Sequence, residues 1–306
     1  MSDYRLVYVL NPVAGKGKYL PEARRAAEEA HADAVHITER QGECIDFIAE
    51  SCLRDPHTHF VVYGGDGTAG EAATGIMRAG AGSHAILSIR PCGSGNDFVR
   101  GIGEFPIPEG EDARWLDLIS VNGRYSINMM NAGFDCDVVE NSEKMRRSHQ
   151  LPNGLSYIVG VGTTLSQKKV FHGSLKLYGV IDPASDAVRD EEIEDDFLII
   201  AAANLPYYGG GFKAAPAADP SDGLMDVMII RDLSRMKFVS LVGGYRTGSY
   251  LNPETLNPYP KYRGVIEYRK CRTLRLDGAP RVCLDGEIIP TAGIHADIVP
   301  RAIRVK

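Results

Sequence analysis

Short apolar runs alternate with segments of helical periodicity in the first third of the chain. The runs at residues 6–10, 60–63 and 85–89 are each followed within two residues by Pro or Gly, which is typical of buried parallel strands. Helices are expected between them, one opened by Pro21, one across residues 45–53 that ends before Pro56, and one from Thr68 to Arg78. Strands that alternate with helices predict a parallel α/β sheet for residues 1–122.

The pattern changes from about Gly123. Strand-like runs then follow one another with few helical segments between them, at residues 125–132, 175–181, 197–203, 224–230 and 265–268. Asp277-Gly278 and Asp285-Gly286 are typical of tight hairpin turns, and helices are expected at Leu155–Lys168 and Arg235–Gly244. Residues 123–290 therefore predict a second, mostly antiparallel β domain. The sequence leaves open whether the tail at residues 291–306 returns to the first domain.

Composition and charge narrow the class of protein. A net charge of −6 over 306 residues argues against a nucleic-acid-binding protein, so an anionic partner would have to meet a local basic patch. The six cysteines form no C-x-x-C pair, which argues against a zinc site or a disulfide framework and suits a reducing cytoplasm. No apolar stretch approaches the roughly 18 residues of a membrane-spanning helix. We expect a cytoplasmic protein that is able to visit a membrane surface.

Two charged segments each lead to a separate prediction. The acidic stretch from Asp182 to Asp196 lies between two predicted strands, and we expect a solvated hairpin tip there rather than a metal site. A basic cluster flanks the apolar segment at residues 155–165. This cluster is either an ordinary solvated surface or a patch that orients the protein on an anionic membrane, and it comprises Lys144, Arg146, Arg147, Lys168 and Lys169.

Three glycine-rich turns each follow a predicted strand of the first domain. They read Asn11-Pro12-Val13-Ala14-Gly15-Lys16-Gly17, Gly64-Gly65-Asp66-Gly67-Thr68 and Cys92-Gly93-Ser94-Gly95-Asn96-Asp97-Phe98. Ligands of open α/β sheets bind beyond the carboxyl ends of the strands, so all three turns are expected to meet at one crevice. Glycines let backbone N–H groups approach phosphate oxygens, and a helix N-terminus adds a favourable dipole. A single such turn is usually only a turn, but three at one edge predict a phosphate site.

The second turn formally matches the dinucleotide fingerprint G-x-G-x-x-G, which we discount. It does not follow the first strand of the domain, and Arg90 stands where an acidic residue would end the next strand. Asp66 between phosphate-facing glycines would repel phosphate unless a cation separates them, so we interpret it as part of a Mg²⁺–triphosphate arrangement. Gly15-Lys16 lacks the flanking residues of a Walker A sequence, and this is not a P-loop enzyme.

The three turns together resemble the nucleotide-site motifs of the diacylglycerol kinase catalytic domain. Later landmarks of that family match in the same order, so the resemblance covers nearly the whole chain: Asn131-Ala132-Gly133-Phe134, Tyr208-Gly209-Gly210-Gly211-Phe212, Asp219 to Asp226, and Leu284-Asp285-Gly286-Glu287. The resemblance implies an ATP-binding α/β domain like that of the NAD kinases, followed by a β-sandwich domain that helps to form the lipid site. The implied activity is transfer of the γ-phosphate of ATP to the hydroxyl of diacylglycerol or a similar membrane lipid.

The resemblance also implies roles for particular residues. Glu287 would be the proton acceptor, with Asp285 sharing that role or helping to hold Mg²⁺, and Asp66 would position Mg²⁺ on the nucleotide. A second, structural Mg²⁺ would lie at Asp219, Asp222 and the carbonyl of Leu224. Nucleotide contacts are implied for Asn11, Pro12, Val13, Ala14, Gly15, Thr38, Gly64, Gly65, Asp66, Gly67, Thr68, Ala69, Gly70, Ser94, Asn96 and Asp97. Ser94 stands where the family usually has Thr, and because the hydroxyl is kept we expect the contact to remain.

Plainer alternatives stay open beside these roles. Asp285-Gly286 is a sound hairpin turn without any chemistry, and residues 219–223 form a sequence typical of a capped turn. An NAD kinase would share the Gly-Gly-Asp-Gly-Thr turn, although no Asn-Glu-x-Asp motif is present, and a non-catalytic nucleotide-binding regulator is a further alternative. The sequence does not identify the lipid acceptor or the oligomeric state. Family members can dimerise, so a homodimer is possible.

Overall fold

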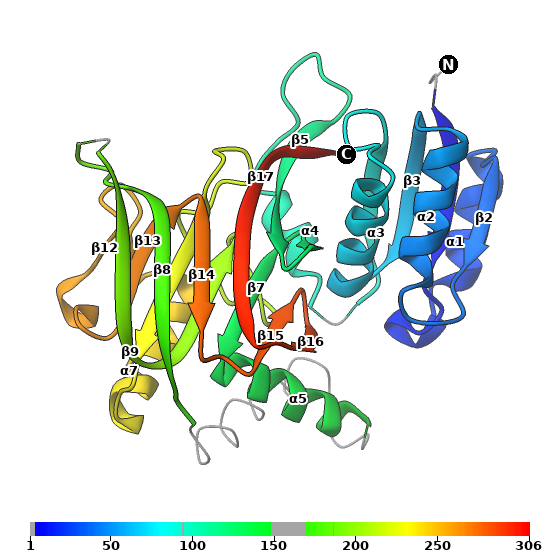
Figure 1. The fold of residues 1–306 in the computed structure, drawn as a ribbon. Coiled ribbons are helices and arrows are strands. Elements are labelled where there is room, and N and C mark those ends of the chain that lie inside the picture. Colours follow the sequence, from blue (N-terminus) through cyan, green and yellow to red (C-terminus); the bar gives the residue numbers. More distant parts are fainter. Residues whose placement is uncertain (1–3, 94, 148–168, 186) are drawn as a thin grey trace.

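The computed structural model describes residues 4–306 except residues 94, 148–168 and 186, and it leaves out the side chains of residues 143 and 145–147. The predicted nucleotide contact at Ser94 and the predicted helix at Leu155–Lys168 therefore lie outside the described residues. The chain forms an α/β domain beside a β-sandwich domain, which confirms the expected fold class (Figure 1).

The first domain is built on parallel strands in the order β2-β1-β3-β4, with bounds Ala34–Ile37, Arg5–Leu10, Thr58–Gly64 and Ile86–Pro91. Three of these strands were predicted from their apolar runs, and β1, β3 and β4 are indeed largely buried. β2 was missed because it is an edge strand with no fully buried residue and hence no continuous apolar run. Burial, rather than strand formation itself, produces the pattern that can be read from a sequence.

Helices α1 (Leu20–Glu29), α2 (Glu43–Arg54) and α3 (Asp66–Arg78) connect these strands, and the short α4 (Asp97–Ile102) follows β4. α3 buries the small residues Ala69, Ala72 and Ala73, which allow close packing against the sheet and against α2. A Cβ atom at Gly75 would lie 2.8 Å from the carbonyl oxygen of Ile45, so only glycine permits this approach. The tight packing fixes α3, whose N-terminus faces the site described below.

The second domain consists mainly of antiparallel strands that continue the same sheet. Their bounds are β5 Arg114–Val121, β6 Arg124–Ser126, β7 Met129–Gly133, β8 Phe171–Ile181, β9 Val188–Ala203, β10 Met225–Arg231, β13 Glu267–Cys271, β14 Thr273–Asp277, β15 Arg281–Leu284, β16 Glu287–Pro290 and β17 Gly293–Val305, with a small pair β11 Leu251–Asn252 and β12 Asn257–Pro258. Helices α5 (Phe134–Arg147) and α7 (Arg235–Thr247) accompany them.

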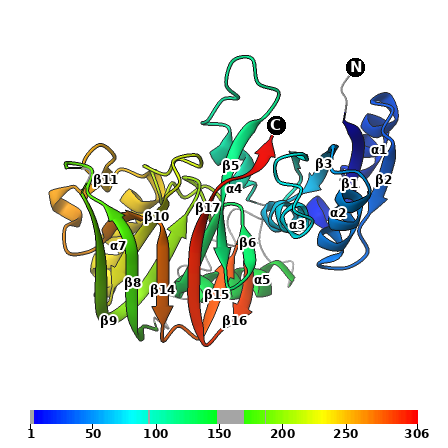
Figure 2. The same cartoon turned by 45° about the horizontal axis from the view of Figure 1, so that its top comes forward.

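β17 connects the two domains. Its first half pairs with β14 in the sandwich (Figure 2). Arg304 and Val305, near its C-terminal end, pair in parallel with β4 of the first domain. Ile303 and Val305 are buried in the core of the first domain together with Leu116 of β5. The final strand thus returns to the first domain and fixes the position of the sandwich relative to the nucleotide-type turns.

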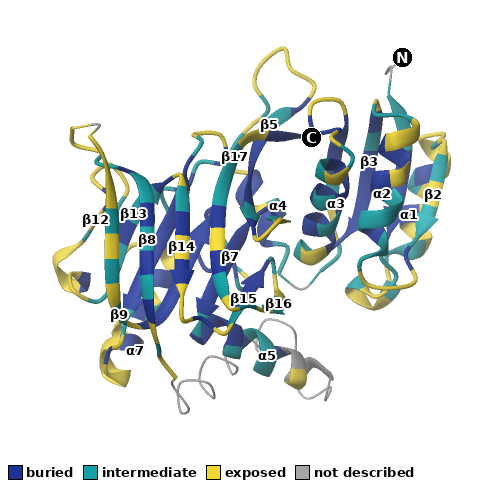
Figure 3. Cartoon of the chain, viewed as in Figure 1, coloured by how far each residue is buried: buried dark blue, intermediate teal, exposed yellow. Residues whose placement is uncertain are grey.

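The sandwich strands alternate buried and exposed positions, as Figure 3 shows along β8, β14 and β17. This alternation is the period of an antiparallel sheet with one face in the core and one face in solvent. One face packs a core that includes Leu175, Ile200 and Leu274, and another core lies under α7 with Phe238 and Tyr250.

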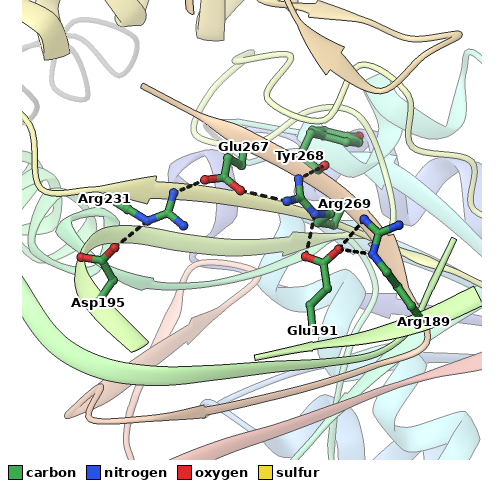
Figure 4. Close-up of polar contacts among 7 residues, drawn as sticks. All are labelled: Arg189, Glu191, Asp195, Arg231, Glu267, Tyr268 and Arg269. Carbon is green, nitrogen blue, oxygen red and sulfur yellow. Dashed lines mark hydrogen bonds and ion pairs between the residues drawn. The ribbon is translucent and has the colours of Figure 1, made fainter. Parts of the chain in front are cut away.

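Two local predictions for this domain need correction, and one helix was not predicted. The acidic stretch at residues 182–196 is the tip of the β8–β9 hairpin only at its start. Residues 188–196 belong to β9 itself, and carboxylates of this part pair with arginines of β10 and β13 across the sheet surface (Figure 4). Asp195 meets Arg231 at 2.7 Å, Arg231 meets Glu267, and Arg269 joins Glu267 and Glu191 at 2.9 Å each. Opposite charges on neighbouring strands stabilise a polar strand that has no apolar run to reveal it.

Asp277-Gly278 is also not a hairpin turn, because β14 and β15 on either side of it do not pair with each other. Asp285-Gly286, in contrast, is a two-residue hairpin: Leu284 pairs with Glu287, and both central residues have positive φ. The helix predicted at Arg235–Gly244 is confirmed as α7, but α5, which follows β7 directly, was not predicted. It begins at Phe134, within the motif that resembled an entry into the second domain.

Candidate active site between the two domains

The three glycine-rich turns meet at one edge of the parallel sheet, as the sequence predicts. The strand register aligns Leu10 with Tyr63, and Gly64 with Pro91, so the turns after β1, β3 and β4 start side by side. The amide of Asn11 donates to the carbonyl oxygen of Tyr63, and that of Cys92 donates to the carbonyl oxygen of Gly64. The Asn11 side chain also donates to the Thr68 hydroxyl at 2.8 Å, which ties the first turn to the N-terminus of α3.

Contact between the turns accounts for part of their glycine content. Gly15 has a φ of 57°, and a Cβ atom there would lie 2.8 Å from the carbonyl oxygen of Cys92. A Cβ atom at Gly93 would lie 2.6 Å from the Cα atom of Gly65. Asn96 holds the third turn by accepting from the Gly93 amide at 2.9 Å and donating back to its carbonyl oxygen at 3.0 Å. The glycines are therefore needed for turn packing whether or not a phosphate binds.

A cavity of about 970 Å³ opens above these turns and extends into the sandwich domain. Its lining at one end comes from the turns, and at the other end from β7, α5, α7, the Tyr208–Phe212 loop and the β15–β16 hairpin. The predicted site residues among the lining are Asn11, Val13, Ala14, Gly15, Gly65, Asp66, Gly67, Thr68, Asp97, Asp285 and Glu287. One cavity thus contacts both domains, and it joins the nucleotide-type turns to the acidic turn.

Two carboxylates converge at the first-domain end of the cavity. The position of a Cβ atom at Gly95 lies 3.0 Å both from Oδ2 of Asp66 and from Oδ2 of Asp97. Burial, together with the negative charge of Asp66, raises the pKa of Asp97 to about 6. Asp66 is oriented by the amide of Phe98, which donates to it at 2.9 Å, and Asp97 accepts from the amide of Gly210 at 2.7 Å. Two adjacent carboxylate oxygens are ligands that Mg²⁺ prefers, so these residues fit a magnesium ion that takes its remaining ligands from phosphate and water.

Further acidic residues make the cavity electronegative. Glu71 lines it as well, and burial together with the charge of Glu287 raises the pKa of its carboxyl group, against a hydrogen bond from the Gly42 amide. Arg246 is the single basic residue among the described lining residues. A bare triphosphate would meet net repulsion here, so an anionic ligand requires an accompanying cation.

The carboxylate of Asp285 is fully engaged by donors from the segment that joins the domains. It accepts from the Ser126 hydroxyl at 2.8 Å, from the Ile127 amide at 2.9 Å, and from the amides of Asn128 and Met129 at 3.0 Å each. Burial nevertheless raises the pKa of Asp285 to about 6. Four hydrogen bonds on one buried carboxylate indicate a positioning role for Asp285, which anchors the β15–β16 hairpin over the connection between β6 and β7.

Asp285→Ala should therefore destabilise the protein by roughly 3–5 kcal/mol, because three backbone amides and a hydroxyl would be left unpaired in a buried site. The matched control is Asp277→Ala in the Asp-Gly dipeptide that ends β14, where the exposed side chain predicts a change within about 0.5 kcal/mol. Urea unfolding followed by circular dichroism measures both. Equal losses in the two variants would contradict the hydrogen-bond explanation.

Glu287 lies two residues further along the same hairpin and differs in environment. Its side chain is 43% exposed, and its nearest basic partner is Arg124 at 3.7 Å. It lines the cavity from the second domain, on the hairpin whose Asp285 packs against Gly67 and Gly70 of α3. Of the two acidic residues in this turn, Glu287 is the one whose carboxylate remains accessible to a ligand.

Several predicted nucleotide contacts do not line the cavity. Thr38 is buried just after β2, where its hydroxyl donates to the carbonyl oxygen of Leu10 at 3.4 Å. Ala69 and Gly70 are buried in the first turns of α3, and the Cα atom of Gly70 packs against the Asp285 side chain. Pro12, Gly64 and Asn96 likewise contribute to the turns without lining the cavity. These residues support the shape of the site, and their contact with a nucleotide stays a prediction.

Other lining residues were missed. Asn128, Asn131 and Ser142 are each at most 5% exposed, and each carries a buried side-chain oxygen that has no hydrogen-bond partner among the described residues. Ser142 and Val139 lie on α5, which the sequence did not predict. Glu71 directly follows the predicted contacts at residues 64–70 but was not singled out, and Arg246 has no motif around it. Asn131 was recognised only as part of a family landmark. Unpaired buried oxygens are costly, so these side chains mark the second-domain end of the cavity as a place where a ligand or water can donate.

The turn at residues 219–224 does not fit a magnesium ion in this arrangement. Asp222 is neutralised by Lys270, whose ammonium lies 2.8 Å from it and 3.0 Å from the buried Asp226. Asp219 accepts from the amide and the hydroxyl of Ser221 at 2.9 and 2.7 Å. The described residues hold no cluster of three or more His, Cys, Asp or Glu side chains suited to a metal. The second, structural Mg²⁺ at Asp219, Asp222 and the Leu224 carbonyl stays a prediction.

Asp135 is a buried carboxyl group close to the cavity wall. It lies in the first turn of α5 and accepts from the Tyr208 hydroxyl at 2.9 Å. Burial raises its pKa to about 7, and the Tyr208 hydrogen bond offsets this only in part. Because its folded-state pKa lies above the ordinary value of 3.8, the folded protein binds more protons than the unfolded chain, and this residue's contribution to stability falls as the pH rises from about 4 to 7.

Asp135→Asn should consequently stabilise the protein at pH 8, by roughly 1–3 kcal/mol relative to the parent chain, because it removes the buried charge and keeps an acceptor for Tyr208. At pH 4, where the carboxyl group is protonated in the folded state and partly protonated in the unfolded chain, the difference should be much smaller. Urea titrations of both proteins across this pH range measure it. The assignment would be contradicted if the unfolding free energy of the variant minus that of the parent were smaller at pH 8 than at pH 4.

Within the described part of the chain, no helix has the length and apolar character needed to cross a bilayer. Of the basic cluster, Lys144 is exposed and paired with Glu140 at 2.8 Å, and Lys169 is exposed. Lys168 and the side chains of Arg146 and Arg147 lie outside the described residues.

Comparison with known proteins gives the same two-part division. Residues 5–124 match the diacylglycerol kinase catalytic domain, and residues 128–306 match the YegS C-terminal NAD kinase beta sandwich-like domain. A protein of Pseudomonas aeruginosa PAO1 named "Probable lipid kinase YegS-like" is 30% identical over all of this chain and 95% of its own length. The diacylglycerol kinase of Bacillus subtilis strain 168 is 24% identical, over 94% of this chain and 93% of its own length.

Solved structures resemble the fold as a whole. A crystal structure of a diacylglycerol kinase from Bacillus anthracis str. Sterne superimposes with a TM-score of 0.67 at 18% identity, and the match covers 100% of this chain and 97% of that one. This likeness supports the arrangement of the two domains. With the two matching domain families and a relative that aligns along the whole chain, this protein belongs to the family of diacylglycerol kinases and YegS-like lipid kinases.

Proposed function

We propose that this protein is an ATP- and Mg²⁺-dependent lipid kinase that phosphorylates the hydroxyl of diacylglycerol or a similar membrane lipid. The observation that carries the proposal is the single cavity between the domains. It brings phosphate-type turns and paired carboxylates of the first domain together with apolar side chains and an accessible carboxylate of the second domain. Such a cavity suits a substrate pair in which one member is a polyphosphate and the other has an apolar body with a polar head.

At the first-domain end, backbone amides of the glycine-rich turns and the N-terminus of α3 would bind the phosphates. Asp66 and Asp97 would hold the magnesium ion, which when bound neutralises charge on the phosphate oxygens. The ion pair of Asp97 with Arg100 at 3.0 Å, and its hydrogen bond to Gly210, fix one carboxylate from both domains. Both carboxylates are therefore positioned before the nucleotide arrives.

At the second-domain end, Met129, Val139, Phe212 and Ile288 would contact the apolar part of the lipid. The lipid oxygen would form a new bond to the γ-phosphorus as the bond from that phosphorus to the β–γ bridging oxygen breaks, which releases ADP. Glu287 would accept the hydroxyl proton. Asp285 would position the hairpin that carries Glu287, because its own carboxylate already accepts four hydrogen bonds.

The decisive test is transfer of labelled phosphate from ATP by the purified full-length chain, with a panel of lipids in mixed micelles and with NAD as the competing acceptor. We expect Mg²⁺-dependent labelling of diacylglycerol or of another lipid hydroxyl, and no NADP. Formation of NADP without any labelled lipid would replace the proposal with an NAD kinase. Binding of ATP without transfer to any acceptor would instead indicate a nucleotide-binding regulator.

A further inference from the structure

Exposed apolar side chains gather around α7 in the second domain. Met236 is 85% exposed and Val239 is 63% exposed, one helical turn apart on the same helix. Tyr259, at 46%, lies next to the short helix at Pro260–Tyr262. Three of the eight exposed large hydrophobic side chains in the described chain therefore fall within 24 residues. We call α7 together with residues 259–263 the α7 surface, and Figure 3 shows the exposed face of its helix.

The same segment is basic in an acidic protein. Residues 232–264 contain five basic residues and two acidic ones, a net charge of +3 against −6 for the whole chain. All five basic side chains are exposed: Arg235, Lys237, Arg246, Lys261 and Arg263. Exposed apolar residues among cationic ones are typical of helices that lie in the interface of an anionic membrane.

α7 is held firmly beneath its exposed face. Phe238, Leu241 and Tyr245 are buried in the sandwich core, and Ser234 caps the helix by accepting from the Lys237 amide. A Cβ atom at Gly244 would lie 2.4 Å from the Tyr262 hydroxyl oxygen, so residues 260–262 pack directly against the helix. The apolar and basic residues are thus presented on a rigid support, and they do not depend on a disordered tail.

The α7 surface is continuous with the candidate active site. Arg246, in the last turn of α7, lines the cavity, and its guanidinium lies 5.9 Å from the centre of the Phe212 ring. Met236 lies ten residues earlier on the same helix, about 15 Å away along its axis. A bilayer in contact with Met236 would therefore lie within the reach of one lipid molecule from the second-domain end of the cavity.

We propose that the α7 surface docks on an anionic lipid bilayer, with Met236 and Val239 at the boundary of the apolar layer and Lys237, Lys261 and Arg263 among the head groups. The inference rests on the proposed lipid kinase function and specifies how the lipid is reached. It assigns membrane contact to α7, in addition to or in place of the basic cluster around Lys144 and Lys169. A bilayer explains both properties of the surface, since apolar burial and attraction to anionic lipid act together.

The test is co-sedimentation of the full-length protein, without ATP, with phosphatidylcholine vesicles that contain or lack phosphatidylserine. We expect binding to the anionic vesicles that weakens at high salt. The double variant Lys237→Glu/Lys261→Glu should weaken it roughly 25-fold or more, because each basic residue near an anionic surface contributes about fivefold. Met236→Ser/Val239→Ser should weaken it roughly tenfold while leaving the salt dependence unchanged.

Matched controls are Leu53→Ser, an exposed apolar residue on α2, and Arg25→Glu, an exposed basic residue on α1. Both should bind vesicles as the parent does, and all variants should phosphorylate a short-chain, monomeric diacylglycerol at the parent rate. Vesicle binding that survives the α7 variants but is lost in Lys144→Glu/Lys169→Glu would overturn the inference. So would a concentration-dependent dimer that only the α7 variants abolish. Normal α7-dependent binding without phosphorylation of any lipid would overturn the proposed kinase and leave the docking surface intact.

Discussion

Asp66→Asn is expected to reduce lipid phosphorylation by at least about three orders of magnitude, because it removes one of the two carboxylates that would hold Mg²⁺ on the nucleotide. The fold should be unaffected: the asparagine oxygen can still accept from the Phe98 amide, as Asp66 does at 2.9 Å. The nearby Asp97 would lose a negative neighbour, so its pKa should fall from about 6 toward the ordinary range. The steady-state rate of phosphate transfer at saturating ATP and Mg²⁺ measures the loss of activity, and the unfolding curve of each protein shows whether the fold is affected.

The matched control for this variant is Asp46→Asn, which removes an exposed carboxylate that pairs with Arg40 and Arg78 at the surface of the same domain. Its rate should equal that of the parent, and its stability should change by no more than about 0.5 kcal/mol. Raising the Mg²⁺ concentration should restore only a small part of the Asp66→Asn activity. Near-normal turnover of Asp66→Asn would show that the carboxylate pair is not the magnesium site.

The first domain could be predicted from its sequence because its strands and turns are marked by residues that are adjacent in the sequence. Buried parallel strands produce continuous apolar runs, and the turns that follow them end at one sheet edge by topology alone. The sequence therefore predicted β1, β3 and β4 from the apolar runs at residues 6–10, 60–63 and 85–89. It also predicted that the three glycine-rich turns meet at one edge of the sheet. The edge strand β2 lacks this signal, since none of its residues is fully buried.

The second domain was less predictable because its determinants are long-range. The polar half of β9 is a strand because Asp195 and Glu191 meet arginines 36 and 78 residues away in sequence, respectively. Asp285 has a different role from Glu287 because its partners lie about 157 residues earlier, at the connection between the domains. Arg246 and Ser142 enter the cavity only once α7 and α5 are packed. Residue type and spacing identify Asp285 and Glu287 as a candidate pair. Only the fold shows that the carboxylate of Asp285 anchors the hairpin, whereas that of Glu287 is accessible.

Glu287→Gln is expected to lower kcat by about 10²–10⁴-fold, because the amide cannot accept the proton of the lipid hydroxyl. ATP binding should change much less, since Glu287 belongs to β16 of the second domain and is not part of the glycine-rich turns. The substitution is nearly isosteric and the side chain is 43% exposed, so the unfolding free energy should stay within about 0.5 kcal/mol of the parent. A loss of rate without a loss of stability separates this residue from Asp285.

The control for Glu287→Gln is Asp277→Asn, which alters the Asp-Gly dipeptide at the end of β14 and should leave kcat unchanged. Asp285→Asn provides the complementary comparison. It should lose stability because an amide group would face donors that now meet a carboxylate, and it should retain more activity per folded molecule than Glu287→Gln. Measurement of kcat, KM for ATP and urea unfolding for the three variants distinguishes the roles. If Asp285→Asn were stable but inactive while Glu287→Gln stayed active, the proton acceptor would be Asp285, and its four hydrogen bonds would have to rearrange when substrate binds.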